Sequence, residues 1–151
     1  MAKINGLLTE VLRPKTLDNI ILLDRIRKQV NDNKLAQNFL LVGTPGSGKT
    51  SLCRILSKDR STLALNMSSE RGIETVRTKI KDFCSTKSLY ANNDDFKVVF
   101  LDELDGAITS TFDALRGTME KFQKSSRFIA TCNRINQIPD AIQDRFIILD
   151  F

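Results

Sequence analysis

The sequence predicts an α/β fold built on a five-stranded, mostly parallel sheet with helices on both faces. Short apolar runs recur along the chain, and they occupy residues 39–42, 63–65, 98–101, 128–131 and 146–151. These runs are rich in β-branched and aromatic residues and do not alternate strictly, which is typical of strands buried on both faces. Segments with helical spacing separate them, and strands that alternate with helices form a parallel sheet.

The helices between these strands are predicted from apolar residues three or four positions apart. The first spans 20–30, and the second spans 51–57, directly after a glycine-rich segment. One face of the third carries Ile73, Val76, Ile80 and Phe83, and one face of the fourth carries Phe112, Leu115, Met119 and Phe122. A polar connection over 85–95 leads into the third strand. Because ligands bind at the carboxyl ends of parallel strands, we expect the functional site at that edge.

The composition is that of a soluble globular protein, with 151 residues of which 41% are hydrophobic and 27% charged. This length predicts a single domain over residues 1–151. No apolar run approaches the ~20 residues that span a bilayer. Residues 1–6 lack the apolar centre of a signal peptide, so we expect the protein in the cytoplasm. The net charge of +5 favours polyanionic partners in general terms, although the basic residues are spread along the chain.

The three cysteines, Cys53, Cys84 and Cys132, are far apart in the sequence, which contains no histidine. They form no C-x-x-C pair, so the pattern argues against a zinc site and against a disulfide framework. We predict that all three are small hydrophobic residues of the core.

Residues 43–50 read Gly-Thr-Pro-Gly-Ser-Gly-Lys-Thr and match the G-x-x-x-x-G-K-[ST] phosphate-binding loop in full. Its glycines permit positive φ, which points successive N–H groups into one concavity. Lys49 supplies a charge for the β and γ phosphates, and the Thr50 hydroxyl can bind Mg²⁺. The strand before this loop and the helix after it add a helix dipole, a context that an accidental glycine-rich turn would lack.

This loop predicts a site for a nucleoside triphosphate, taken to be ATP, and Mg²⁺. The residues expected to bind nucleotide are Gly43, Thr44, Pro45, Gly46, Ser47, Gly48, Lys49, Thr50 and Ser51.

Two acids, Asp102 and Glu103, follow directly after the apolar strand that starts at residue 97. The end of this strand should lie at the carboxyl edge of the sheet, beside the phosphate-binding loop. Asp102 is suited to hold Mg²⁺, with Thr50 on the other side of the metal. Glu103 points in a different direction and could orient and deprotonate an attacking water. An acidic pair of this kind is typical of an ATP hydrolase.

A polar residue also follows the strand 127–131. Asn133 would face the γ phosphate and is the predicted sensor of that phosphate, with Thr131 as the alternative. Near the end of the chain, Arg145 admits two interpretations. It could stabilise the end of a short helix through the helix dipole, or it could act as an arginine finger for a neighbouring subunit.

These residues resemble the AAA+ ATPases, a branch of the P-loop NTPases, and more narrowly the small subunits of sliding-clamp loaders. Those are the replication factor C type of eukaryotes and archaea and their phage-encoded counterparts. Four stretches carry the resemblance. Residues 12–19 are similar to "YRPKTLDE", 66–73 to "NASDERGI" and 114–120 to "ALRRTME", while 127–133 are similar to the family's sensor 1 strand.

The resemblance implies a subunit of a ring-like, pentameric ATPase that opens a sliding clamp and places it on primer–template DNA. It assigns Lys49 and Thr50 to phosphate and Mg²⁺, Asp102 to the metal, Glu103 to the catalytic base and Asn133 to sensor 1. Arg145 stands where the family presents its arginine finger in a Ser-Arg-Cys motif. Arg13 and Pro14 lie in the segment that packs against adenine. Asn66 corresponds to the polar residue that restrains the glutamate until DNA binds.

Two regions are similar to the DNA-tracking elements of the family. The residues implied are Ser69, Arg71, Gly72 and Ile73 at the start of one helix and Thr109 at the start of the next. Contacts from helix N-termini to phosphates would give affinity without sequence reading.

The sequence departs from the family at three places. Gly117 replaces the second arginine of "LRRTME", and Asp144, next to Arg145, could pair with the expected finger. The family continues into a helical lid and a collar, whereas this chain ends at Phe151 inside an apolar strand. We therefore expect a core domain without lid and collar, either a truncated piece or a phage product that acts in the host cytoplasm.

Two other interpretations stay open at this point. One is a different DNA motor of the same superfamily, such as a helicase loader or a branch-migration helicase. The other is a nucleotide-binding module that assembles or regulates without turnover. A small-molecule kinase is disfavoured, because it would need an arginine-rich acceptor site and would have no use for Glu103 as a water base.

Overall fold

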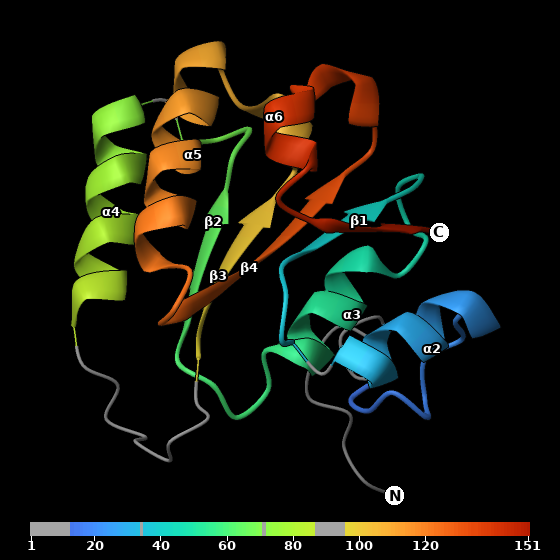
Figure 1. Ribbon diagram of the computed structural model, residues 1–151. Coiled ribbons are helices and arrows are strands. Elements are labelled where there is room, and N and C mark those ends of the chain that lie inside the picture. The colour runs from blue at the N-terminus through green and yellow to red at the C-terminus, as the bar shows by residue number, and fades with distance from the viewer. Residues whose placement is uncertain (1–12, 34, 71, 87–95) are drawn as a thin grey trace, which may run out of the picture.

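The structure, a computed structural model, describes residues 13–33, 35–70, 72–86 and 96–151. Its centre is a five-stranded sheet in the order β2-β3-β4-β1-β5, in which every neighbouring pair is parallel (Figure 1). The strands are β1 (Phe39–Val42), β2 (Thr62–Asn66), β3 (Lys97–Asp102), β4 (Ser126–Cys132) and β5 (Ile147–Asp150). The predicted α/β fold and its five strands are therefore confirmed, and the sheet is parallel throughout.

Helices cover both faces of this sheet, as predicted. They are α2 (Asp24–Asn33), α3 (Lys49–Leu56), α4 (Ile73–Ser85), α5 (Thr109–Phe122) and α6 (Asp140–Gln143), with two short 3₁₀ turns, η1 (Leu104–Gly106) and η2 (Ile135–Gln137). Figure 1 shows α4 and α5 side by side, and α2 and α3 together on the other side of the sheet. None of the described helices is long and apolar enough to cross a membrane.

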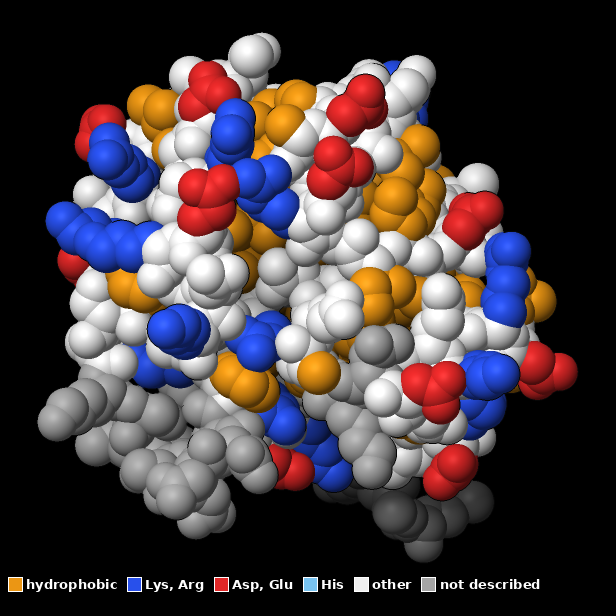
Figure 2. Space-filling model, viewed as in Figure 1, with side chains coloured by type: hydrophobic (Ala, Val, Ile, Leu, Met, Phe, Trp, Pro, Cys, Tyr) orange, Lys and Arg blue, Asp and Glu red, His pale blue; other side chains and the backbone are white. Residues whose placement is uncertain are grey.

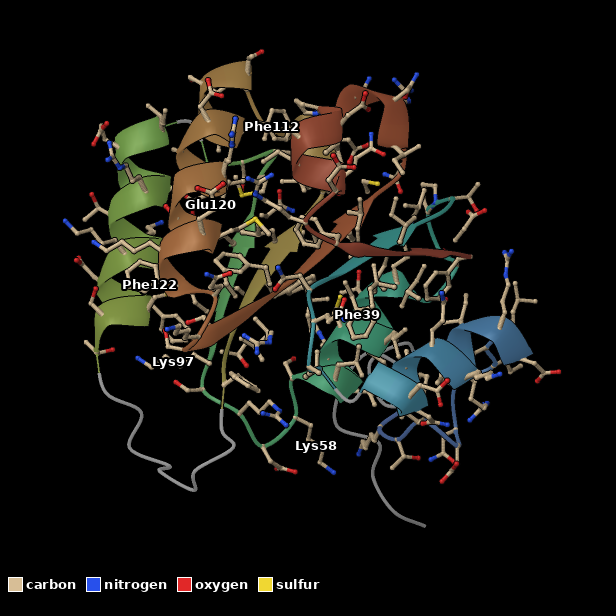
Figure 3. The ribbon with its side chains drawn as sticks, viewed as in Figure 1. Phe39, Lys58, Lys97, Phe112, Glu120 and Phe122 are labelled. Carbon is tan, nitrogen blue, oxygen red and sulfur yellow. The ribbon has the colours of Figure 1, made fainter. Side chains whose placement is uncertain are left out.

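Two apolar cores lie on the two faces of the sheet. Phe39 of β1 is fully buried in the core beneath α2 and α3, together with Ile26 and Leu52. Phe112 of α5 belongs to the opposite core, beneath α4, α5 and α6 (Figure 3). Alternate side chains of each central strand enter the two cores, because successive residues of a strand point to opposite faces. This explains why the central strands read as continuous apolar runs.

The register of the strands brings the ends of β1, β3 and β4 to one edge of the sheet. Leu41 pairs with Thr131, and Val42 pairs with Cys132, so the segment after β1 starts beside the end of β4. On the other side of β4, Asp102 ends β3 in register with Asn66 of β2. The turns that follow these strands are therefore neighbours in space, although up to ninety residues separate them in sequence.

The first helix differs from the prediction. We expected a helix over 20–30, but α2 starts at Asp24 and continues to Asn33. The guanidinium of Arg27 donates to the backbone oxygens of Leu17 and Ile20, at 2.9 and 3.1 Å, and so holds the preceding segment outside the helix. Ile21 is consequently 97% exposed. Apolar spacing alone cannot reveal this side-chain contact.

The prediction for the cysteines is confirmed, since Cys53, Cys84 and Cys132 are all buried and free. Burial raises the pKa of each thiol, and the pKa of Cys132 reaches about 11. The thiols are therefore neutral near pH 7 and serve as apolar filling. Most of the predicted polar connection, residues 87–95, lies outside the described residues.

Candidate active site

A pocket of about 590 Å³ opens at the carboxyl edge of the sheet. It is lined by Arg13, Pro45, Gly46, Gly48, Lys49, Thr50, Ser51, Asp102, Glu103, Thr131, Cys132 and Asn133. Nearly all of these residues come from the turn after β1 with the start of α3, and from the carboxyl ends of β3 and β4 with the residues that directly follow them. The pocket thus joins the predicted phosphate-binding loop, the predicted acids and the predicted sensor. Of the other predicted residues, Pro14, Gly43, Thr44, Ser47 and Arg145 do not line this pocket.

The glycine loop after β1 has a backbone that only glycine adopts readily. Gly46 has a φ of 82° and Gly48 a φ of 99°, both in the left-handed region. Gly48 also precedes the first residue of α3, so the open N–H groups of this helix face the pocket. The backbone N–H of Gly43 donates to Cys132 at 3.2 Å and ties the loop to the end of β4. The backbone N–H groups of this loop and of the start of α3 thus form a typical site for an anion.

Lys49, the first residue of α3, is buried under the loop. Its ammonium group donates to the backbone oxygens of Gly43 and Thr44, at 2.6 and 2.8 Å, and to Oδ1 of Asn133 at 3.1 Å. Burial lowers the pKa of Lys49, while Cys132, Asp105 and Asp102 act in the opposite direction. All three ammonium protons have acceptors, so a phosphate oxygen must displace at least one of them. Of the three acceptors, only Asn133 is a side chain, so it can move away while the two hydrogen bonds to the backbone of the loop remain.

Asp102 and Glu103 are held by the same hydroxyl group. Thr131, which is 2% exposed, donates from Oγ1 to Oδ1 of Asp102 at 2.6 Å. The same oxygen accepts the backbone N–H of Glu103 at 3.0 Å. Glu103 has a φ of 53° and a ψ of 52°, a left-handed conformation that is uncommon for a residue other than glycine. Thr131, predicted as an alternative phosphate sensor, thus has its hydroxyl engaged by the two acids.

The carboxylate of Glu103 is in contact with Ser68. The Ser68 hydroxyl lies 2.6 Å from Oε2 of Glu103 and 2.6 Å from Oδ1 of Asn66. Asn66, predicted to restrain Glu103, reaches it only through Ser68 among the hydrogen bonds of the described residues. Its side-chain oxygen is occupied by the backbone N–H groups of Ser68 and Ser69, at 3.0 and 3.3 Å. The direct contact with Glu103 is thus made by Ser68, which the sequence analysis did not name.

A second carboxylate joins the turn after β3 to the turn after β4. Oδ2 of Asp105 accepts the backbone N–H groups of Asn133 and Arg134, at 3.2 and 3.1 Å. Asp105, with Glu103 and Asn133, also lines an adjoining pocket of about 470 Å³. The turn that carries Asn133 is thus anchored from the acidic turn.

Arg145 lies away from the pocket and is paired within its own chain. Its guanidinium donates to Glu120 of α5 and to the backbone oxygen of Ala141. Arg116 lies 3.6 Å from the same Glu120 oxygen. The hydrogen bond from Arg145 lowers the pKa of Glu120. Asp144, suggested by the sequence as the acid beside Arg145, forms no ion pair with it among the described residues, because Glu120 takes that position.

Arg13 and Pro14 lie beside the pocket, at its outer rim. Arg13 lines the main pocket, and both residues line an adjoining hollow of about 290 Å³ together with Ile55 of α3. The hollow offers apolar surface from Pro14 and Ile55, and the basic residues Lys15, Arg54 and Lys58 complete its lining.

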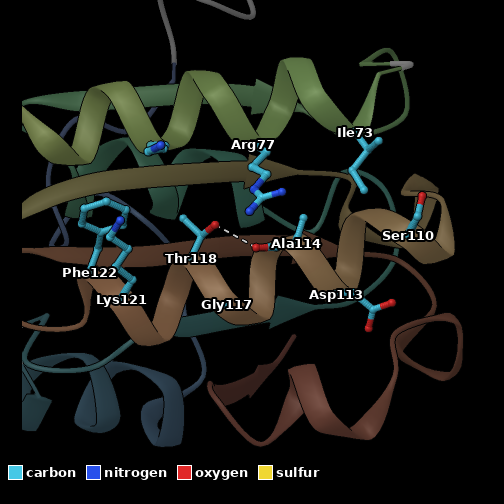
Figure 4. A pocket seen from close by; sticks show the side chains of 10 residues that line it. Ile73, Arg77, Ser110, Asp113, Ala114, Gly117, Thr118, Lys121 and Phe122 are labelled. Carbon is cyan, nitrogen blue, oxygen red and sulfur yellow. Dashed lines mark hydrogen bonds between the residues drawn. The ribbon is translucent and has the colours of Figure 1, made fainter.

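The residues implied in DNA contact lie at the starts of α4 and α5. Gly72 precedes α4, Ile73 begins it, and Thr109 begins α5; Ser69 lies in the turn before α4, and Arg71 lies outside the described residues. Ile73 also lines a groove of about 590 Å³ between the two helices, into which Arg77 reaches (Figure 4). On the face shown in Figure 2, basic and acidic side chains lie interspersed and form no single basic patch.

The pocket contains oxygen groups that suit Mg²⁺. Thr50 and Asp102 both line it, and a hydroxyl with a carboxylate is a hard oxygen donor set. Among the described residues, no group of three or more His, Cys, Asp or Glu side chains is arranged to hold a metal ion. Mg²⁺ is usually held by one or two protein groups together with phosphates and water, so this sparse donor set fits it.

Sequence reasoning missed Ser68, Asp105 and Glu120 as members of the site and its surroundings. Ser68 and Glu120 lie inside quoted motifs, at 66–73 and 114–120, and Asp105 follows the two acids by two residues. For Ser68 and Glu120, their position inside these motifs was the only signal in the sequence that could have indicated a role in the site. Their partners lie 25 to 35 residues away in sequence, so spacing could not supply the contacts.

Comparisons with known proteins give both a family and a fold. The family model described as "ATPase family associated with various cellular activities (AAA)" matches residues 39–150. The chain is 39% identical to the replication factor C small subunit of Methanococcus vannielii over 94% of its own length and 48% of that protein. The corresponding protein of Methanothermobacter thermautotrophicus is 36% identical, with coverage of 100% and 49%. The chain thus spans about half the length of these relatives.

Solved structures of RuvB variants from Thermotoga maritima share the fold, with a TM-score of 0.74 at 21% identity for one of them. That structure covers 93% of this chain, and the chain covers 48% of it.

Proposed function

We propose that this chain, which belongs to the AAA family of ATPases, binds and hydrolyses ATP as the ATPase core of a sliding-clamp-loader subunit. In this proposal, ATP turnover is coupled to opening a clamp and loading it on primer–template DNA. The similarity to replication factor C small subunits over 94% of the chain supports the clamp-loader assignment. The single observation that carries the ATPase assignment is the pocket shared by the glycine loop, the two acids and Asn133.

The triphosphate would occupy the glycine loop at the start of α3. The loop N–H groups and the helix dipole stabilise its negative charge. Lys49 would exchange its contact with Asn133 for a phosphate oxygen, since the Nζ–Oδ1 distance of 3.1 Å is the longest of its three hydrogen bonds. Asn133, once released, is placed to contact the γ phosphate, which is the sensor role implied by the resemblance. Arg13 and Pro14 would lie against the base.

Thr50 and Asp102 are the residues that would hold Mg²⁺. When bound, this metal neutralises phosphate charge and orients the triphosphate. Thr131 leaves the second carboxylate oxygen of Asp102 available, because its hydrogen bond goes to Oδ1. Asp102 would therefore present that oxygen to the metal or to a water in its shell.

Glu103 would act as the base that orients and deprotonates the attacking water. Its carboxylate now accepts the hydroxyl proton of Ser68, which draws it toward β2. That hydroxyl has one proton and two acceptors, so it can donate to Asn66 when Glu103 turns toward the nucleotide. Ser68 and Asn66 together would then restrain the base until the start of α4 contacts DNA.

Arg145 would act in trans as an arginine finger in the pocket of a neighbouring subunit. It follows α6 by two residues and does not line its own pocket, which suits a group that serves another chain. Glu120 holds it in the isolated chain.

The ring is proposed to be pentameric, with other clamp-loader subunits, a sliding clamp and primer–template DNA as partners. Ser69, Gly72, Ile73 and Thr109, with Arg71, would contact DNA phosphates.

The test is a comparison of wild-type chain with Glu103→Gln. The variant should bind ATP with unchanged affinity in calorimetry and should lose turnover by about 100-fold or more, since a positioned base contributes 10²–10⁴-fold. Turnover that persists in the variant would remove Glu103 from the base role. Absence of ATP binding by the wild-type chain would end the ATPase proposal.

A second experiment tests the clamp-loader assignment. ATPase rates are measured with neither addition, with primed DNA, and with primed DNA plus a sliding clamp. Stimulation that requires both supports a clamp loader, whereas stimulation by DNA alone would favour another DNA motor. A rate that no addition changes, with tight ATP binding, would favour a module that works without turnover.

A further inference from the structure

We infer that Thr131 and Asp105 are positioning residues for ATP hydrolysis, which lock the acidic turn (residues 102–105) to the polar turn (residues 131–134). This inference rests on the proposed ATPase function and assigns two residues to it. Neither residue needs to touch the nucleotide. Each acts through a group to which the proposal gives a chemical role: Thr131 acts through Asp102 and Glu103, and Asp105 acts through Asn133.

Thr131 forms the first link between the two turns. Its hydroxyl uses its proton on Oδ1 of Asp102 and a lone pair on the backbone N–H of Glu103, at 2.6 and 3.0 Å. It is 2% exposed, so water does not compete for either contact. One side chain of β4 thus sets both the direction of the Asp102 carboxylate and the backbone from which Glu103 projects.

Asp105 forms the second link, in which a side chain of the acidic turn contacts the backbone of the polar turn. Its Oδ2 accepts the N–H groups of Asn133 and Arg134, so the acidic turn holds the polar turn by its backbone. Its Oδ1 is buried and has no hydrogen-bond partner among the described residues. A buried carboxylate oxygen without a partner is costly. The free energy of folding therefore gains little from a carboxylate at position 105, which favours a role for Asp105 in positioning the site.

The two links matter because Glu103 has an unfavourable backbone. Its φ of 53° is held at the start of η1, where the hydrogen bond to Thr131 and the bond from Gly106 to its carbonyl oxygen fix the turn. A residue of this kind persists only where its surroundings determine it. If the acidic turn relaxed, the Glu103 carboxylate and Asn133 would no longer converge on one water. A displacement of about 1 Å in such a site can cost 10²-fold in rate.

The experiment compares two pairs of variants that separate hydrogen bonding from shape. Thr131→Val keeps the shape and loses both hydrogen bonds, and Thr131→Ser keeps the hydroxyl. Asp105→Ala loses the acceptor, and Asp105→Asn keeps a carbonyl oxygen that can accept the same two N–H groups. Each variant is measured for kcat and KM, for ATP affinity by calorimetry with Mg²⁺ and with EDTA, and for its unfolding midpoint.

We expect Thr131→Val to lower kcat by about 100-fold. Its ATP affinity in EDTA should equal that of wild type, while the gain in affinity on adding Mg²⁺ should shrink, because Asp102 is no longer oriented. Thr131→Ser should restore both to within about 3-fold. Asp105→Ala should lower kcat with little change in KM, and Asp105→Asn should restore it.

The inference is overturned if Thr131→Val hydrolyses ATP at the wild-type rate, or if Thr131→Ser is as impaired as Thr131→Val. Should Thr131→Val fail to fold, the Asp105 pair decides, and equal rates for Asp105→Ala and wild type would overturn it. Failure of the proposed function would give different results. The wild-type chain would then not bind ATP, or Glu103→Gln would still hydrolyse ATP. Wild-type activity that depends on Glu103 but not on Thr131 or Asp105 refutes the positioning roles alone.

Discussion

The Ser68 hydroxyl and the Glu103 carboxylate lie 2.6 Å apart and connect the end of β2 to the predicted catalytic base. Asn66 offers the same hydroxyl a second acceptor, also at 2.6 Å. A hydroxyl has a single proton, so it can serve only one of the two at a time. Glu103 can therefore be released without leaving Ser68 unpaired, which lowers the cost of moving the base toward a bound nucleotide.

Ser68→Ala should raise the ATPase rate in the absence of DNA by up to about 10-fold, because a hydrogen bond to a charged group contributes about 1.5 kcal/mol. ATP affinity should not change. The matched control is Ser69→Ala, since the Ser69 hydroxyl donates to the Asn66 backbone oxygen and does not contact Glu103. A basal rate that Ser68→Ala leaves at the wild-type level would mean that Ser68 does not restrain the base.

Arg145→Ala should lower the ATPase rate of an assembly by about 10³-fold, the contribution usual for an arginine finger. In mixtures with Glu103→Gln, which keeps Arg145 but lacks the proposed base, the rate should partly recover, because a Glu103→Gln chain can supply its arginine to the intact site of an Arg145→Ala neighbour. Arg116→Ala is the control, since Arg116 contacts the same Glu120 oxygen. No recovery of the rate in this mixture would assign Arg145 to structure alone.

The pKa of Glu120 should lie below the usual glutamate value of 4.5, chiefly because Arg145 donates to its carboxylate. A carboxyl with a lowered folded-state pKa stabilises the fold above its unfolded pKa. That contribution is present at neutral pH and is lost as the pH falls through the lowered value. An NMR titration of the Glu120 carboxyl should show this midpoint, and Arg145→Ala should move it up toward 4.5. An unchanged midpoint would mean that the pair does not persist in solution.

Lys97→Met should destabilise the chain by about 2 kcal/mol, as expected for lost hydrogen bonds from a charged donor. Lys97 is buried at the start of β3, and its ammonium donates to the backbone oxygens of Phe83 and Thr86 at the end of α4. Urea unfolding measures the effect. Lys58→Met is the control, since Lys58 is exposed (Figure 3) and should change stability by at most about 0.5 kcal/mol. Equal effects of both changes would mean that the hydrogen bonds of Lys97 to the end of α4 do not stabilise the fold.

Gly117→Ala should stabilise the chain by about 1 kcal/mol, because glycine is unfavourable inside a helix. Gly117 is exposed on α5, and an added Cβ would meet no atom within 4 Å. Gly106→Ala is the contrasting change, since its Cβ would lie 2.8 Å from the Cβ of Ser68 and should destabilise the turn. Thermal unfolding of both variants measures the two effects. A loss of stability in Gly117→Ala would contradict the free space found around an added Cβ at this position.

Several parts of this architecture could be read from the sequence because they depend on local pattern. The loop at 43–50 needs glycines at positive φ, and only its residue types and spacing are required to predict it. The apolar runs predicted five strands, since a parallel strand buried on both faces carries a continuous apolar signal. The start of α2 was predicted wrongly, because the Arg27 side chain binds the carbonyl oxygen of Ile20, which the predicted helix would have used, and that of Leu17 before it.

Residue types and their spacing along the chain determined by themselves the α/β class, the phosphate-binding loop and the two acids at the end of β3. Tertiary structure alone decided which side chains those acids meet: Thr131 with Asp102, Ser68 with Glu103, and Glu120 with Arg145. The reason is physical. A backbone preference acts over a few neighbouring residues, whereas a hydrogen bond between side chains depends on strand register and helix packing, which bring together residues 25 to 35 positions apart.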